Sequence, residues 1–213
     1  MPMDTQLVNL SILSGVLGSV STWAIQSARE WWSSPRLNAS FEDKLPFRLE
    51  TQVAVENSQP HDAVYFRIGV RNDGVTNAKS CRGFLLGVDE DSGKGLWRPT
   101  QYCDNLPLTW AYRSKGDSEQ GIDIPRGVNQ FLDVFSISES VTGFKPLTSA
   151  QTRKADAHDR FKAPGMFRFR ILVVAENAKS QFFGLCLEWK GDWQQAWQGN
   201  GDGLKVRQCT DFY

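Results

Sequence analysis

The sequence predicts an all-β domain, an antiparallel β-sandwich of about seven strands, preceded by one apolar N-terminal α-helix that crosses a membrane. Three observations support this fold class. Apolar and polar residues alternate in several segments after residue 46, and clusters of Gly, Pro, Asn and Asp separate those segments. No helical period of any length occurs in the same part of the chain. The aromatic content of 12%, with eight Trp, is typical of a β-rich core.

The clearest strand pattern lies in residues 64–90. Apolar side chains occupy every second position of residues 64–70, which predicts one buried and one polar face. The Asn-Asp-Gly turn at 72–74 tolerates positive φ, so the chain can reverse there. The apolar pattern then resumes over residues 81–88. We therefore expect a hairpin here that carries part of the core.

The remaining strands and the domain limits follow from the same alternation. Long polar stretches interrupt it between residues 138 and 164 and again after residue 190. The other expected strands are Arg48–Val55, Leu106–Tyr112, Asn129–Ile137, Phe167–Val173 and Gln181–Lys190. The expected domain limits are 1–32 for a membrane-anchor helix, 33–46 for a linker, 47–190 for the sandwich and 191–213 for a Gly- and Gln-rich tail.

Residues Leu7–Ile25 carry no charge over 19 positions, which at about 1.5 Å per residue nearly matches the bilayer core. A secretory signal peptide would begin with basic residues, and none precedes this run. A buried helix of a soluble domain is an alternative. We favour a single membrane-spanning helix, because small residues recur in rows that let two helices approach closely in lipid. These candidate self-association residues are Ser11, Gly15, Gly18, Ser19 and Thr22.

The flank of this run predicts its orientation. Trp31 and Trp32 suit the headgroup region, and Arg29 and Arg36 lie on the C-terminal side only. This asymmetry predicts a single-pass membrane protein whose domain lies in the cytoplasm. In that reducing compartment the four cysteines would remain free thiols.

The segment Ile68–Cys81 reads I-G-V-R-N-D-G-V-T-N-A-K-S-C. It resembles the Asn-x-Gly turn of bacterial immunoglobulin-like adhesion and accessory modules, and Ile124–Gly127 is similar to the Pro-x-Gly that precedes a strand in them. The resemblance covers roughly Val64–Trp189 and implies an immunoglobulin-like sandwich. With its N-terminal run, the chain looks more like uncharacterised bacterial proteins with a membrane helix and a cytoplasmic sandwich.

Composition and motifs speak against several functions. The formal net charge of +0 and pI near 6.7 give no strong signal for nucleic-acid binding. The cysteines are scattered and only His61 and His158 are present, so we expect no metal site and no cofactor. Neither histidine lies near a nucleophile motif, and no phosphate-binding glycine loop occurs. We therefore expect a protein that is not an enzyme.

Two ligand hypotheses remain. In immunoglobulin strand order, residues 81–88 and 165–174 are neighbours, so Arg82, Arg168 and Arg170 could form an anion-binding outer face. The alternative is an ordinary solvated face in which acids pair these arginines. Exposed Trp side chains could instead stack on sugars, although Trp in a sandwich more often covers the core. The candidates are Trp97, Trp110, Trp193 and Trp197.

These observations predict a membrane-anchored module for protein interaction or sensing, with the lipid bilayer and an unidentified protein as partners. It could form a homo-oligomer through its helix. By analogy of layout alone, such a module suits a bacterial stress or defence system. The alternative is a soluble or exported β-sandwich that binds a carbohydrate or nucleotide and packs its N-terminal helix on the domain.

Overall fold

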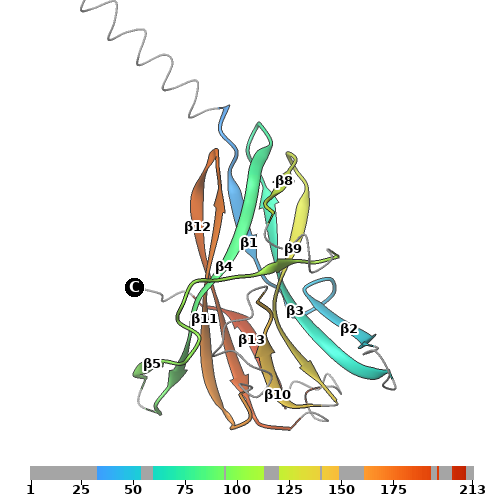
Figure 1. Ribbon diagram of the computed structural model, residues 1–213, viewed down its shortest axis with the longest axis vertical. Coiled ribbons are helices and arrows are strands. Elements are labelled where there is room, and N and C mark those ends of the chain that lie inside the picture. Colours follow the sequence, from blue (N-terminus) through green and yellow to red (C-terminus); the bar gives the residue numbers. More distant parts are fainter. Residues whose placement is uncertain are drawn as a thin grey trace, which may run out of the picture.

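The computed structural model describes residues 33–53, 60–93, 95–112, 120–139, 141–148, 161–192, 196 and 203–209. Within these ranges the chain is all-β, with 13 strands in two antiparallel sheets (Figure 1). The predicted all-β class with two facing sheets is confirmed. No helix in the described ranges is long and apolar enough to cross a membrane. The expected anchor helix, its small-residue rows, Arg29, Trp31 and Trp32 all lie outside the described residues.

The first sheet has six strands in the order β1-β3-β9-β10, with β2 beside β3 and β7 beside β9. Its strands are β1 (Leu37–Ser40), β2 (Arg48–Val53), β3 (His61–Asn72), β7 (Thr109–Trp110), β9 (Asn129–Ser138) and β10 (Val141–Pro146).

The second sheet has seven strands in the order β13-β12-β11-β4-β5, and β6 and β8 also pair with β4. Its strands are β4 (Ala78–Asp91), β5 (Trp97–Pro99), β6 (Leu106–Pro107), β8 (Ile122–Ile124), β11 (Gly165–Ala175), β12 (Ala178–Trp189) and β13 (Leu204–Gln208). The long strand β4 is therefore covered on its outer edge by three short strands, which removes most of an exposed edge.

Aromatic rings join the two sheets across the core. Phe135 of β9 stacks on Phe66 at 4.5 Å and on Phe169 of β11 at 5.0 Å between ring centroids. Phe66, Ile68 and Val70 are fully buried, as their alternation predicts. The pattern in β3 therefore identified the core face of the first sheet correctly.

The expected hairpin between residues 64 and 90 is wrong in one respect. β3 and β4 do not pair with each other, because β3 belongs to the first sheet and β4 to the second. The turn after Asn72 carries the chain from one sheet to the other. A turn sequence fixes where the chain reverses, but the partner of each strand depends on distant residues.

Several short strands lie where the sequence indicates none. β1 falls in the expected linker 33–46, β10 in the expected long loop, and β13 in the expected tail. β8, Ile122–Ile124, also lies outside the expected strands. Each offers only two or three apolar side chains, so its alternation is too short to stand out. The sheets therefore extend beyond the expected limits 47–190.

The expectation of four free thiols is also wrong for two of them. Cys186 of β12 and Cys209 form a disulfide that fastens β13 and the residue after it to the neighbouring strand. Cys81 and Cys103 are free, the first buried and the second exposed. Sequence separation did not reveal the pair, because β13 itself was not predicted.

Candidate functional site

The predicted neighbours β4 and β11 do pair, with Arg82 opposite Val174, Arg170 opposite Gly87 and Arg168 opposite Asp89. The three arginines thus lie on one sheet but not together. Arg170 and Val174 are four residue steps apart on β11, so Arg82 lies about 13 Å from Arg170 along the strands. The expected single basic patch is divided into two parts.

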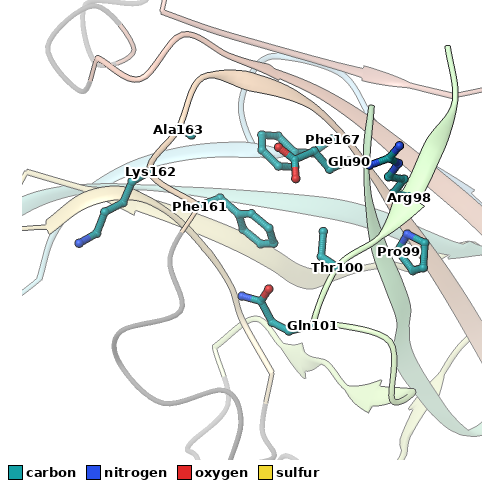
Figure 2. A pocket seen from close by; sticks show the side chains of 9 residues that line it. All are labelled: Glu90, Arg98, Pro99, Thr100, Gln101, Phe161, Lys162, Ala163 and Phe167. Carbon is teal, nitrogen blue, oxygen red and sulfur yellow. The ribbon is translucent and has the colours of Figure 1, made fainter. Parts of the chain in front are cut away.

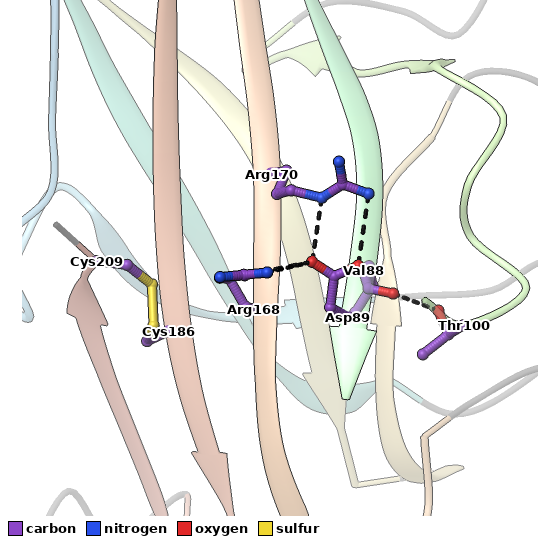
Figure 3. A network of polar contacts seen from close by, with 7 residues as sticks. All are labelled: Val88, Asp89, Thr100, Arg168, Arg170, Cys186 and Cys209. Atoms are coloured by element: carbon purple, nitrogen blue, oxygen red, sulfur yellow. Dashed lines mark hydrogen bonds and ion pairs between the residues drawn. A yellow bond between two sulfur atoms is a disulfide. The ribbon is translucent and has the colours of Figure 1, made fainter. Parts of the chain in front are cut away.

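Arg168 and Arg170 converge on one carboxylate, that of Asp89 (Figure 3). Arg168 donates from Nη2 at 2.9 Å and from Nε at 3.2 Å to Asp89 Oδ2. Arg170 Nε lies 3.1 Å from the same oxygen, and its Nη2 donates to Oδ1 at 3.4 Å. The Asp89 side chain is only 7% exposed, so this network is held at the surface of the sheet and not in bulk water. Two guanidinium groups thus share one carboxylate.

Two flat neighbours shape this network. The guanidinium of Arg168 lies over the ring of Trp97, with Cζ 4.7 Å from the ring centroid. Arg170 lies over Gly87, where a Cβ would come within 2.7 Å of its Nη2. A larger residue at position 87 would displace the Arg170 guanidinium. The network gives the nearly buried Asp89 two cationic partners.

A second feature is a cavity of about 600 Å³ at the end of the sandwich, which we call the end groove (Figure 2). This volume falls within the range of about 300–1,000 Å³ that ligand sites occupy. Residues of β4 and β5 form one wall, and the segment that leads into β11 forms the other. Its lining comprises Glu90, Arg98, Pro99, Thr100, Gln101, Phe161, Lys162, Ala163 and Phe167.

The floor of the end groove is aromatic and its rim is charged. Phe161 and Phe167 have ring centroids 4.9 Å apart, and Phe161 also stacks on Phe144 at 4.7 Å. Glu90 and Arg98 are exposed at the rim. The aromatic floor packs directly on the core through Phe144. The rim carries both a negative and a positive side chain. Sequence analysis missed this groove, since its walls come from segments about 60 residues apart.

The Trp residues are less available for sugars than the sequence alone allows. Trp110 is 2% exposed, and its Nε1 donates to the carbonyl of Cys81 at 3.2 Å, so it is a core residue. Trp97 lies partly buried beneath Arg168. Trp193 and Trp197 lie outside the described residues.

The first described residues, 33–36, contact the turn after Asn72, at the end of the domain opposite the end groove. The buried Asn72 amide donates to the carbonyls of Thr76 at 2.8 Å and Ile124 at 3.0 Å. Its Oδ1 accepts from the backbone N–H of Arg36 at 3.1 Å and of Gly74 at 3.0 Å. All four hydrogen-bonding positions of this amide are used. We call this set of contacts the Asn72 junction.

Neighbouring contacts complete the Asn72 junction. Thr76 Oγ1 donates to the carbonyl of Ser33 at 2.7 Å, and the Asp73 N–H donates to the carbonyl of Arg36 at 2.8 Å. A Cβ on Gly74 would come within 2.4 Å of the Pro35 and Arg36 backbone. Arg36, an expected membrane-interface residue, is thus exposed beside a backbone that the turn holds firmly.

Two properties of the described ionisable groups bear on chemistry, their clustering and their shifted pKa values. No three His, Cys, Asp or Glu side chains in these ranges gather closely enough to hold a metal ion. Burial raises the pKa of the Cys81 thiol to about 11, which disfavours the reactive thiolate. Burial also raises the pKa of Asp133, although Arg67 opposes this with an ion pair of 2.6 Å. His61 lies in β3, and His158 lies outside the described residues.

Comparison with known proteins adds no family. No protein-family model matches the sequence, and a search of curated proteins found no match. The residues described above are therefore the basis for a functional proposal.

Proposed function

We propose that this chain is a non-catalytic binding module, an immunoglobulin-like sandwich tethered to a membrane by residues 1–32, that holds a partner protein in its end groove. The main supporting observation is that the Asn72 junction and the end groove lie at opposite ends of the domain. The Asn72 junction precedes Ala78, the first residue of β4, and Glu90 lies at the other end of that strand. Twelve residue steps at about 3.3 Å each separate Ala78 from Glu90 by about 40 Å.

The chemistry of the end groove supports a protein partner. Protein interfaces combine an apolar centre with a polar rim, and an aromatic floor bordered by Glu90 and Arg98 has this arrangement. Phe161 and Phe167 supply apolar area that is already ordered by the core. Binding at this groove would therefore cost this domain less conformational entropy than binding at a mobile loop would.

The immunoglobulin-like assignment rests on topology and on resemblance. The chain passes from β3 in one sheet to β4 in the other through the Asn-Asp-Gly turn. Pairing of β4 with β11 agrees with the strand order that the resemblance implies. The membrane tether rests on the uncharged run Leu7–Ile25, and helix self-association remains a prediction from its small residues.

Site-specific photo-crosslinking tests the groove. The full chain would carry p-benzoylphenylalanine at Gln101 in the end groove or at the exposed Lys179 at the other end. In cells of the native host, the Gln101 position should give a discrete adduct that the Lys179 position does not. Arg98→Glu should remove that adduct. Equal labelling from both positions, or no adduct from either, would refute the groove as the binding site.

Fractionation tests the tether separately. The full chain should sediment with membranes and resist extraction at alkaline pH, because a spanning helix is released only by detergent. Recovery in the supernatant without detergent would refute the tether and leave the groove untouched.

A second candidate is the exported binding module, which the Cys186–Cys209 disulfide favours. Disulfides persist mainly in oxidising compartments, whereas the flanking arginines predict a cytoplasmic domain. Thiol trapping separates the two, with a maleimide polymer added after the cells are denatured in acid, so that buried Cys81 is also reached. Modification of all four cysteines without a reductant supports the cytoplasm, and modification of only two supports export.

A further inference from the structure

The outer face of the second sheet carries a row of apolar side chains that are not part of the hydrophobic core. Leu172 of β11 lies directly opposite Phe84 of β4 on one side and Phe182 of β12 on the other. Pro107 of β6 continues the row beyond Phe84. We call these four residues the outer strip. They run across four adjacent strands.

The outer strip faces away from the core. Successive side chains of a strand point to opposite faces, and the neighbours Gly83, Val173 and Phe183 are the buried ones. Phe182 is 50% exposed, and Pro107, Phe84 and Leu172 are each partly exposed. Single exposed apolar residues are ordinary, but a contiguous row across a sheet is typical of an interaction surface.

Arginines border the outer strip along the strand direction. Arg82, opposite Val174, lies two residue pairs beyond the Leu172–Phe84 pair on one side, and Arg170 lies two pairs beyond it on the other. Arg170 is 37% exposed and lies between Gly87 and Gly184 in the register, so no side chain of those partners covers it. Arg82 is exposed and makes no ion pair with any described residue.

We infer that the outer strip docks a protein segment whose apolar residues are flanked by carboxylates. Charge complementarity selects this occupant, because the borders are cationic about 13 Å apart and the middle is apolar. A carboxylate meeting Arg170 would form a charge-assisted hydrogen bond with a guanidinium that Asp89 already orients. This surface lies on a different face from the end groove.

A second copy of the same face fits less well. A two-fold contact places identical patches together, so the arginines of one copy would meet those of the other. An anionic membrane also fits less well, since the nearly buried Asp89 neutralises part of the arginine charge at one border. Both alternatives become outcomes of the test.

Fluorescence anisotropy with defined peptides tests this inference. The probe is a labelled peptide of about twelve residues, with central leucines and two glutamates at each end. Two control peptides replace the glutamates with lysines or the leucines with serines. The full chain in mild detergent should bind the first peptide about ten-fold more tightly than either control.

Variants locate the contact. Leu172→Ser and Arg82→Glu should each weaken binding of the acidic peptide about ten-fold. Lys205→Glu makes the same charge change on β13 of this sheet, away from the outer strip, and should leave binding unchanged. Gln101→Ala in the end groove should also leave it unchanged, which separates this surface from the proposed function.

Three results would overturn the inference. The first is equal binding of all three peptides or no binding. The second is concentration-dependent dimerisation that Leu172→Ser abolishes while peptide binding is absent. The third is Arg82-dependent binding to phosphatidylglycerol vesicles in place of the peptide. Circular dichroism of each variant confirms that loss of binding is not loss of fold.

Discussion

Replacing Asn72 with Ala removes the centre of the junction that joins β1, the turn before β4 and β8. The side chain makes four hydrogen bonds, and those with Ile124 and Gly74 are buried. The backbone of Asn72 would remain in place, since its carbonyl accepts from the Gly127 N–H at 2.8 Å. The substitution therefore isolates the contribution of the amide.

The expected cost follows from the groups left without partners. A buried donor or acceptor that loses its partner costs about 1–3 kcal/mol, and two such groups remain at Ile124 and Gly74. The contacts with Thr76 and Arg36 are closer to water, which can replace the amide there. We expect Asn72→Ala to lower the free energy of unfolding by about 2–6 kcal/mol.

Asn72→Asp offers a sharper version of the same change. The shape is kept, but a carboxylate would face the carbonyl oxygens of Thr76 and Ile124. Repulsion would raise the pKa of that carboxyl, so the variant should gain stability as pH falls below its folded pKa and the acid becomes protonated. Asn72→Ala should show no such additional pH dependence.

Urea unfolding followed by Trp fluorescence measures these changes, since the chain has eight Trp. Asn38→Ala is the matched control, because its amide makes a single exposed contact of 3.4 Å with Asp73 in the same region. The control should change stability by less than about 0.5 kcal/mol. If Asn72→Ala is as stable as this control, the buried hydrogen bonds do not hold the junction and the reasoning fails.

Three further changes test the core and its ionisable groups. Gly83→Ala would place a Cβ 2.2 Å from Leu132 Cδ2, so calorimetry should show that the free energy of unfolding falls by about 1–3 kcal/mol. An unchanged unfolding transition would mean that the two sheets are not closely packed at this position. Asp133→Asn leaves the buried Arg67 guanidinium without its 2.6 Å partner, so urea unfolding should report a loss of about 3–5 kcal/mol, and a loss below about 1 kcal/mol would contradict this. The pKa of Cys81 is raised from 9.0 to about 11, so its stabilising contribution is complete below pH 9 and is lost as pH rises through about 11. Between pH 8 and 11 the free energy of unfolding should therefore fall more steeply for the wild type than for Cys81→Ala. Equal slopes would refute the raised pKa of Cys81.

Sequence patterns predicted the long strands because each buries a continuous face. β3, β9, β11 and β12 show enough alternating residues to identify their core sides. β1 and β13 do not, because each has four or five residues at an edge of its sheet. Their positions depend on contacts with β3 and β12 that no local pattern specifies.

The candidate sites show the same division. The pairing of β4 with β11 was predicted, and with it the common face of Arg82, Arg168 and Arg170. The ion pairs of Asp89 were not, because its acidic and Gly-rich neighbours are typical of a turn. The end groove needs two segments that meet only in the folded chain. The spacing of residues along the sequence does not reveal how close two such segments lie in the fold.

The Asn72 junction also determines how the domain responds to a pulling force. It holds the start of β1, while the end groove lies at the far end of the strands. Tension between these points would run along the strand axes, across hydrogen bonds that lie perpendicular to antiparallel strands. The four residue pairs from Leu37↔Asn72 to Ser40↔Gly69 would then be sheared together and not peeled one at a time. A module tethered at Ser33 and loaded at the groove would bear that load collectively.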